Sequence, residues 1–234
     1  MIFKWNKIGA LRCGGAVLSG LMLAASFPGW SQSTLIFTAL VPLLLAVQSL
    51  SARQTAALSW LCGVVFYGVS LSWFWQMTNT VDAWAFKFGT GGALLFIVSY
   101  CAFYFIPFGV AAAWCGRVWS DGSFFKNIRI MMFMTMLWTG LEYLRGTLFT
   151  GFGWNALGVS QYANPAMIQV AEWGGVAVVS AVIVWMNMGV FLTIRQYVKH
   201  RQFRKYRPHF ELILGLTPLA LSVAFGMQVL FGAS

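Results

Sequence analysis

Long runs of apolar residues, separated by short polar turns, follow one another along the whole chain. A membrane-spanning helix needs about 20 mostly apolar residues. Seven runs are close to that length or longer, and they cover residues 11–27, 34–50, 56–76, 89–114, 128–145, 165–194 and 210–231. The pattern predicts an all-α fold, a polytopic membrane helical bundle of about seven transmembrane helices. Residues 1–234 are then a single transmembrane domain.

The composition points to lipid rather than water as the solvent of this chain. Hydrophobic residues make up 59% and charged residues 9% of the sequence, whereas about 25% of the residues in a soluble domain are charged. So few charges could not cover a soluble surface. The basic N-terminus followed by an apolar run also fits a cleaved signal peptide. A second aromatic-rich segment and another run follow at once, which favours a retained first helix.

The positions of the positive charges predict the orientation of the helices. If the N-terminus lies inside the cell, 13 of the 15 lysines and arginines fall in inner segments, because positive residues collect on the cytoplasmic side. The inner ones are Lys4, Lys7, Arg12, Arg53, Arg117, Lys126, Arg129, Arg195, Lys199, Arg201, Arg204, Lys205 and Arg207, and the outer ones are Lys87 and Arg145. Seven spans then place the C-terminus outside. The net charge of +10 reflects inner loops that attract anionic lipid headgroups, and no nucleic-acid partner is expected.

A long outer loop, residues 146–164, differs from the other short connections. It mixes glycines with the aromatic residues Phe149, Phe152, Trp154 and Tyr162. Irregular backbone at membrane depth must be buried in protein or line a wet cavity, and aromatic side chains suit the headgroup zone. We therefore expect this loop to form the floor of a site at the outer membrane surface.

Glu142 and Arg145 are the most informative polar residues, because ionisable groups at membrane depth are costly and are functional candidates by default. Their spacing of three places both on one face of the helix that leads into the loop. Two compatible interpretations remain open. The residues form an ion pair that fixes the helix end and the loop, or they contact a lipid headgroup directly.

The polar residues of the loop also have two interpretations. Trp154, Asn155 and Gln161 either anchor and cap the loop or form the walls of a substrate groove. The sequence contains no GxSxG, HExxH or P-loop motif, so no catalytic residue, metal ligand or cofactor is predicted. Four cysteines, in no metal-binding spacing, fit small apolar packing residues; they are Cys13, Cys62, Cys101 and Cys115.

One block of sequence resembles a known family. It reads Glu142-Tyr143-Leu144-Arg145-Gly146, then Phe149-Thr150-Gly151-Phe152-Gly153-Trp154, then Gly158-Val159-Ser160-Gln161. This block is similar to the pattern of apolipoprotein N-acyltransferases, and weaker matches in the right order extend it over residues 27–187. Two features depart from the family pattern: Gly153 stands where the family has Pro, and Ala177 stands where it has Tyr.

The resemblance implies a bacterial inner-membrane protein with a periplasmic C-terminus, acting in lipoprotein biosynthesis. Enzymes of that family move an acyl chain from a phospholipid, through a cysteine thioester, to the α-amino group of a diacylglyceryl lipoprotein. Their Glu-Lys-Cys catalytic set lies in a nitrilase-like domain that follows the seventh helix, and this sequence ends at Ser234. The expected substrate-binding residues are Glu142, Arg145, Phe149, Phe152, Trp154, Asn155 and Gln161.

Three hypotheses for the function follow. In the first, the chain is the membrane domain of an N-acyltransferase, truncated or working with a separately encoded nitrilase-like domain, and it is inactive alone. In the second, it is a non-enzymatic lipid-binding or scaffold protein derived from that fold. A small transporter is the third, and the lack of an inverted repeat disfavours it.

Overall fold

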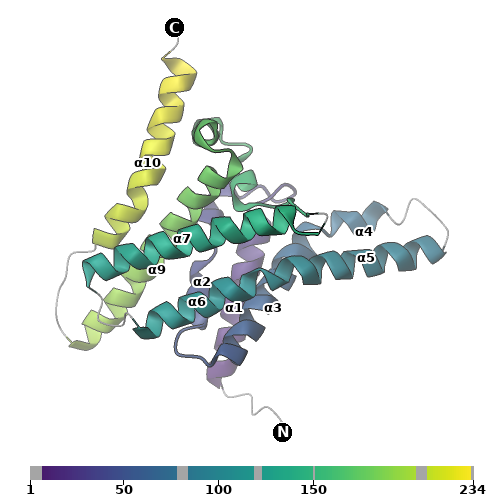
Figure 1. The fold of residues 1–234 in the computed structure, drawn as a ribbon, viewed down its shortest axis with the longest axis horizontal. Helices are drawn as coiled ribbons and strands as arrows, with labels where there is room; N and C mark the ends of the chain where they lie inside the picture. Colours follow the sequence, from purple (N-terminus) through teal and green to yellow (C-terminus); the bar gives the residue numbers. More distant parts are fainter. Residues whose placement is uncertain (1–6, 78–83, 119–122, 150, 204–209, 233–234) are drawn as a thin grey trace.

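The computed structural model describes residues 7–77, 84–118, 123–149, 151–203 and 210–232, and every regular element in these ranges is a helix (Figure 1). The first half contains α1 (Lys7–Ala25), the 3₁₀ helix η1 (Ser33–Phe37), α2 (Val41–Ala46), α3 (Ala52–Ser70), α4 (Trp73–Met77), α5 (Trp84–Phe103) and α6 (Phe105–Val118). The second half contains α7 (Phe124–Thr147), η3 (Leu157–Gln161), α8 (Pro165–Ile168), η4 (Gln169–Trp173), α9 (Val176–Phe203) and α10 (Phe210–Phe231). The expected all-α fold is confirmed for the described ranges.

Within the described ranges, three helices are long and apolar enough to cross a membrane, and they cover Gly89–Val118, Val176–Val198 and Phe210–Phe231. Shorter apolar helices cover Gly9–Ala25 and Ser33–Ala46. The long helix α7 carries charged residues near both ends, which lower its mean hydropathy. The chain is therefore a helical protein with several apolar helices suited to a membrane.

Four of the seven expected segments are not single continuous helices, and two of these, residues 56–76 and 89–114, divide into α3 with α4 and into α5 with α6. Residues 34–50 divide into η1 and α2, with a turn between them. Residues 165–194 divide into α8, η4 and α9. Gly175 has a φ of 68° just before α9 begins, and this left-handed backbone interrupts a right-handed helix. The apolar pattern predicted the extent of these segments but missed their interruptions.

Glycines allow α1, α5 and α6 to pack closely against α3. A Cβ at Gly20 of α1 would lie 2.7 Å from the carbonyl oxygen of Cys62, and one at Gly63 of α3 would lie 2.7 Å from the Cα of Ala102. A Cβ at Gly109 of α6 would meet the Ser59 hydroxyl. Small residues at such interfaces let the backbones of membrane helices approach each other.

A buried asparagine connects the interrupted second segment to α9. The Asn187 side-chain oxygen accepts a hydrogen bond from the Leu40 amide at 2.9 Å. Its amide nitrogen donates to the carbonyl oxygens of Ile36 at 2.8 Å and Ile183 at 2.9 Å. We call Ile36, Leu40 and Asn187 the Asn187 cluster. The Asn187 side chain satisfies the Leu40 amide at the break between η1 and α2, and it adds a second bond to the Ile36 carbonyl oxygen, which also accepts from the Ala39 amide at 3.4 Å.

Helix α10 contacts α9 in a similar way, because a side chain of α9 replaces a backbone hydrogen bond that is missing in α10. Pro218 lies inside α10 and has no N–H to donate to the carbonyl oxygen of Leu214. The indole nitrogen of Trp185 on α9 donates to that oxygen at 2.8 Å. Near this point Gly189 and Gly215 face each other, so that a Cβ on Gly189 would lie 2.8 Å from the Gly215 Cα. The rest of α10 extends away from the body of the protein (Figure 1).

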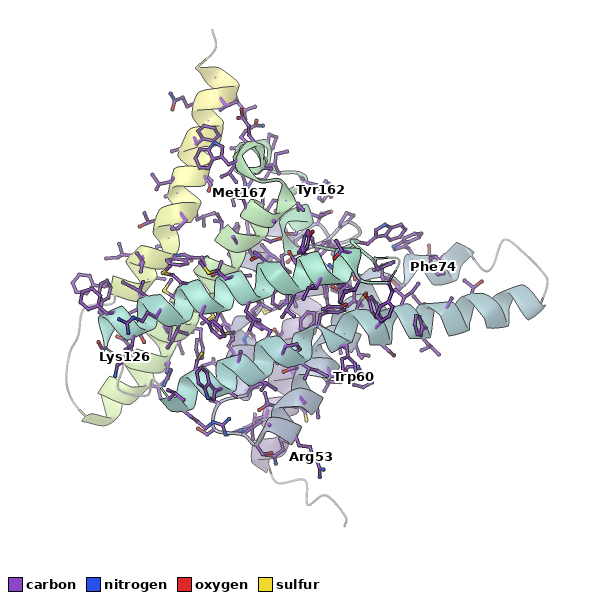
Figure 2. All side chains as sticks on the ribbon, viewed as in Figure 1. Arg53, Trp60, Phe74, Lys126, Tyr162 and Met167 are labelled. Carbon is purple, nitrogen blue, oxygen red and sulfur yellow. The ribbon has the colours of Figure 1, made fainter. Side chains whose placement is uncertain are left out.

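The connections between helices meet on two sides of the molecule. Figure 2 shows Tyr162 in the upper part of the molecule and Phe74 at the right, with Lys126 at the left and Arg53 at the bottom. On the first side, which we call the loop side, the Ser31 hydroxyl and the Tyr162 hydroxyl lie 2.9 Å apart. On the opposite side the guanidinium of Arg12 donates to the Gln48 carbonyl oxygen at 3.0 Å. Each of these two bonds joins segments that the charge pattern assigns to the same side of the membrane.

Candidate functional site

Arg145, near the end of α7, is the largest fully buried side chain among the described residues, with 2% of its surface exposed. Its guanidinium donates to the carbonyl oxygens of Phe152 at 2.7 Å and Trp154 at 2.6 Å. The guanidinium carbon also lies 5.3 Å from the centroid of the Tyr67 ring, within cation–π range. The charge is thus held by carbonyl dipoles and an aromatic face, and its role in this geometry is to hold the loop.

Glu142, one turn earlier on α7, holds the other end of the same loop. Its carboxylate accepts a hydrogen bond from the Leu157 amide at 2.7 Å, where η3 begins. The hydrogen bonds of Glu142 and Arg145 run to the main chain of the loop, and within the described ranges no ion pair joins the two side chains. Of the two earlier interpretations, the fixing of the loop is observed, and it does not depend on pairing.

The backbone of the loop is strained at several residues, and the bonds from Glu142 and Arg145 help to hold it in this conformation. Phe149, Gly151 and Asn155 have φ values of 59°, 71° and 57°, in the left-handed region that costs a residue with a side chain about 1–2 kcal/mol. A Cβ at Gly151 would meet the carbonyl oxygen of Gly146, so glycine is required there for space as well. The Phe152 amide donates to the Arg145 carbonyl oxygen at 2.8 Å and closes the turn.

Trp154 and Asn155 connect the loop to the end of α3 and to α4. The Trp154 ring stacks on Trp73, with centroids 5.6 Å apart and an interplanar angle of 22°. The Asn155 side-chain nitrogen donates to the Ser70 hydroxyl at 2.7 Å. About half of the Trp154 surface remains exposed. Five of the seven expected site residues therefore gather here, and they are Glu142, Arg145, Phe152, Trp154 and Asn155.

Gln161, another expected site residue, lies in the interior and away from this group. It is 1% exposed, and its side-chain nitrogen donates to the Ser33 carbonyl oxygen at 2.9 Å. The amide of Gly158, one turn earlier, donates to the Ser180 hydroxyl at 2.9 Å. These bonds join η3 to η1 and α9, so the observed contacts of Gln161 are those of an anchor.

Phe149 lies on the other face of the loop, where it is 93% exposed. It borders an open cavity of about 490 Å³, which we call the aromatic groove. The groove is lined by Trp60, Phe96, Ser99, Tyr100, Phe103, Tyr104 and Phe149. Tyr100 contacts Phe149 edge-to-face, with centroids 6.3 Å apart. Trp60 lies on α3 beside α5 and α6 (Figure 2).

A second, small cavity adjoins the aromatic groove and shares Tyr104 with it. It is lined by Tyr67, Tyr104, Phe105, Trp138, Leu141, Glu142 and Arg145, and its volume of about 10 Å³ is close to that of one water molecule. The aromatic groove therefore ends close to the two charged residues that hold the loop.

Sequence reasoning missed most of the groove. Phe96 and Tyr100 of α5, and Tyr104 directly after that helix, are spaced by four, a spacing that places side chains on one helix face. This row of aromatic residues could have indicated one wall of the groove from the sequence alone. Pro107, in the first turn of α6, also accounts for the break after Phe103, because proline clashes with the carbonyl of the residue four positions before it.

None of the four cysteines lines the aromatic groove. Cys62, Cys101 and Cys115 are buried in the helical core and Cys13 is half-buried, and none forms a disulfide. A thiol nucleophile acts as an exposed, activated thiolate. None of these four cysteines is therefore placed as an exposed nucleophile at the described site.

We expect Glu142→Ala to loosen the start of η3 while α7 stays folded. The substitution removes the acceptor of the Leu157 amide, and a lost hydrogen bond to a charged group costs about 1.5–3 kcal/mol. Hydrogen exchange in detergent measures this: exchange at the Leu157 amide should speed up by roughly tenfold or more. Glu142→Gln, which keeps a side-chain oxygen, is the matched control. Unchanged exchange in the alanine variant would contradict the anchoring role.

Comparisons with known proteins confirm the resemblance of the sequence to a known family. Residues 19–189 match the family model described as the apolipoprotein N-acyltransferase N-terminal domain. The chain is 33% identical over 213 residues to an apolipoprotein N-acyltransferase of Geobacter metallireducens, which covers 91% of this chain and 39% of that protein. It is 28% identical to the enzyme of that name from Thermotoga maritima, over 77% of this chain and 35% of the relative. The enzyme from Pseudomonas syringae is 29% identical, over 73% and 31%. The chain thus spans about two fifths or less of the length of these relatives.

Proposed function

This chain belongs to the apolipoprotein N-acyltransferase family through the N-terminal domain of that family, and we propose that it binds phospholipid and diacylglyceryl lipoprotein substrates for N-acylation. The relatives carry the activity in their names, but they are more than twice as long as this chain. The role proposed for residues 1–234 is therefore to hold lipid substrates at the membrane surface.

The observation that carries this proposal is the aromatic groove. Its lining is almost entirely apolar, it is open, and it adjoins the cavity beside Glu142 and Arg145 through Tyr104. Burial of each acyl CH₂ contributes roughly 0.8 kcal/mol, so a groove of this kind can hold a lipid chain before any reaction. The exposed Phe149 and Trp154 rings lie where a lipid could contact the loop, and Arg145 and Glu142 position that loop.

We further propose a bacterial inner-membrane location with about seven spans, a cytoplasmic N-terminus and a periplasmic C-terminus. Two bonds between connecting segments support this topology: Ser31 with Tyr162 on the loop side, and Arg12 with Gln48 on the opposite side. On the side opposite the loop, the Arg195 guanidinium donates to the Gly116 carbonyl oxygen at 2.9 Å, near the basic ends of α6 and α9. In Figure 1 the first turns of α1 and the last turns of α10 lie at opposite ends of the molecule.

The proposed N-acylation needs a Glu-Lys-Cys catalytic set, and we propose that a nitrilase-like domain supplies it to the lipid substrates that residues 1–234 hold. The burial of Cys62, Cys101 and Cys115 supports it, because a buried thiol cannot reach a phospholipid ester. An assay with a diacylated lipopeptide and phospholipid tests it. The purified 234-residue chain should give no product, and supply of a family catalytic domain should restore turnover. Turnover by the chain alone would contradict the proposal, and no turnover in either case would favour the non-enzymatic lipid-binding alternative.

We expect Ser99→Trp to reduce phospholipid binding to the aromatic groove. Ser99 is the small residue of the lining, and an indole there occupies the space of several methylene groups. The loss of about two methylenes corresponds to roughly tenfold weaker binding, which native mass spectrometry of the detergent-solubilised protein measures. Leu95→Trp is the control, because Leu95 is 71% exposed on the same helix and does not line the groove. Equal phospholipid retention in both variants would remove the groove from the proposed function.

A further inference from the structure

A second apolar cavity lies between α10, α9 and η4, and we call it the α10 groove. Its volume is about 490 Å³, and it is lined by Val170, Trp173, Val178, Val182, Pro218, Leu221, Ser222, Ala224, Phe225 and Gln228. It shares no lining residue with the aromatic groove. In Figure 1, α10 and α5 extend from the body in different directions, so the two grooves belong to different parts of the molecule.

The walls of the α10 groove are fixed by packing. The Trp173 and Phe225 rings pack against each other with centroids 4.8 Å apart. At Gly226 the helix lies directly against the carbonyl oxygen of Ala166, so that a Cβ would collide with it. At the other end of the groove, the bond from Trp185 to the Leu214 carbonyl oxygen holds the helix at Pro218. The groove is therefore a built concavity between three elements and not a gap beside a free helix.

The polar groups in the lining leave little for a polar ligand to bind. The Ser222 hydroxyl donates to the Pro218 carbonyl oxygen at 2.7 Å. Gln228 lies at the far end of the groove from Pro218, and Phe225, one turn before it on α10, packs against the exposed Trp173. A polar amide and an indole at one end, with an apolar interior below, suit a lipid whose head lies at the membrane interface.

Helix α10 itself indicates what fills the groove. It is one of the three helices apolar enough to cross a membrane, and only 17% of its most apolar window is buried. The groove follows α10 from Pro218 to Gln228, a length of about 15 Å along a helix. In a membrane such an elongated, apolar, open concavity is next to acyl chains at all times.

We propose that the α10 groove is a second lipid-binding site, which holds one acyl chain of a membrane phospholipid between α9, α10 and η4. This site is separate from the groove of the proposed function. Its occupant contacts Val178 and Val182 on α9 on one wall and Ala224 on α10 on the other.

Photocrosslinking tests the proposal. The chain is placed in nanodiscs of phosphatidylethanolamine and phosphatidylglycerol that contain a small fraction of phospholipid with a diazirine in its acyl chain. Adducts are then mapped by mass spectrometry. They should concentrate on residues 170–182 and 218–228 relative to Ile213 and Leu216, which are exposed on α10 outside the groove. Adducts spread evenly over the exposed face of α10 would overturn the site.

Two variants from opposite walls complete the test. Ala224→Trp and Val178→Trp should each lower the groove adducts by about tenfold, the loss expected for roughly two displaced methylene groups. Ala220→Trp, on an exposed position of the same helix outside the lining, should leave them unchanged. Unchanged adducts in both groove variants would overturn the proposal. Because Ser99→Trp acts on the other groove, failure of one site is distinguishable from failure of the other.

Discussion

Replacement of Arg145 by alanine should lower the free energy of unfolding by about 3 kcal/mol or more. The variant loses two hydrogen bonds from a charged group to the carbonyl oxygens of Phe152 and Trp154, and it loses the contact with the Tyr67 ring. Both carbonyls then remain partly buried without their donor. For a chain of this size such a loss corresponds to a fall of roughly 6–12 °C in Tm.

The Tm of this variant can be measured through the reactivity of the buried cysteines. Cys62, Cys101 and Cys115 are shielded in the folded state, so a fluorogenic maleimide reports unfolding of the detergent-solubilised protein on heating. Tyr143→Ala is the control, because Tyr143 is 71% exposed on the same turn of α7. Arg145→Lys should recover only part of the loss, since an ammonium lacks the planar face that lies over Tyr67. Equal Tm values for Arg145→Ala and the parent chain would refute the role assigned to Arg145.

Asn187→Leu should be about as damaging, although it adds apolar surface to a membrane helix. The leucine cannot accept from the Leu40 amide or donate to the Ile36 carbonyl oxygen. The unsatisfied Leu40 amide costs about 1–3 kcal/mol and the lost bond to Ile36 about 1 kcal/mol, so we expect a total loss of about 2–4 kcal/mol in the free energy of unfolding.

The same thermal assay checks this second expectation. Thr193→Val on α9 is the matched control, because the Thr193 hydroxyl bonds only to the Gly189 carbonyl oxygen within its own helix. That control should change Tm by little. An Asn187→Leu variant as stable as Thr193→Val would mean that water or a backbone shift replaces the bonds of the Asn187 cluster.

Much of the fold and part of the site could be predicted from the sequence, because both depend on local signals. The apolar runs predicted helical segments, and the family pattern located the loop that Glu142 and Arg145 hold. The number of spans and the orientation stay predictions. The spacing of Glu142 and Arg145 also suggested an ion pair. The structure instead directs both side chains to the main chain of the loop, because a folded loop offers carbonyl and amide groups that a helical spacing rule does not contain.

The break between η1 and α2 and the two grooves depend on contacts between segments far apart in the sequence. The break between η1 and α2 is stable because Asn187 supplies the missing hydrogen bonds from 147 residues away. The aromatic groove requires α3, α5 and the loop to meet, and the α10 groove requires α9, α10 and η4 to meet. A spacing of aromatic residues on α5 could have indicated one wall of the first groove, and the other walls follow only from the tertiary fold.

The long separation within the Asn187 cluster also has a consequence for biogenesis. The ribosome adds about 5–20 residues per second, so Asn187 emerges roughly 7–30 s after Leu40. Throughout that interval the Leu40 amide and the Ile36 carbonyl lack the partner that later satisfies them. The bonds from residues 33–47 to Asn187 can therefore form only after α9 has been synthesised. The order of synthesis makes α9 the element that completes the first half of the bundle.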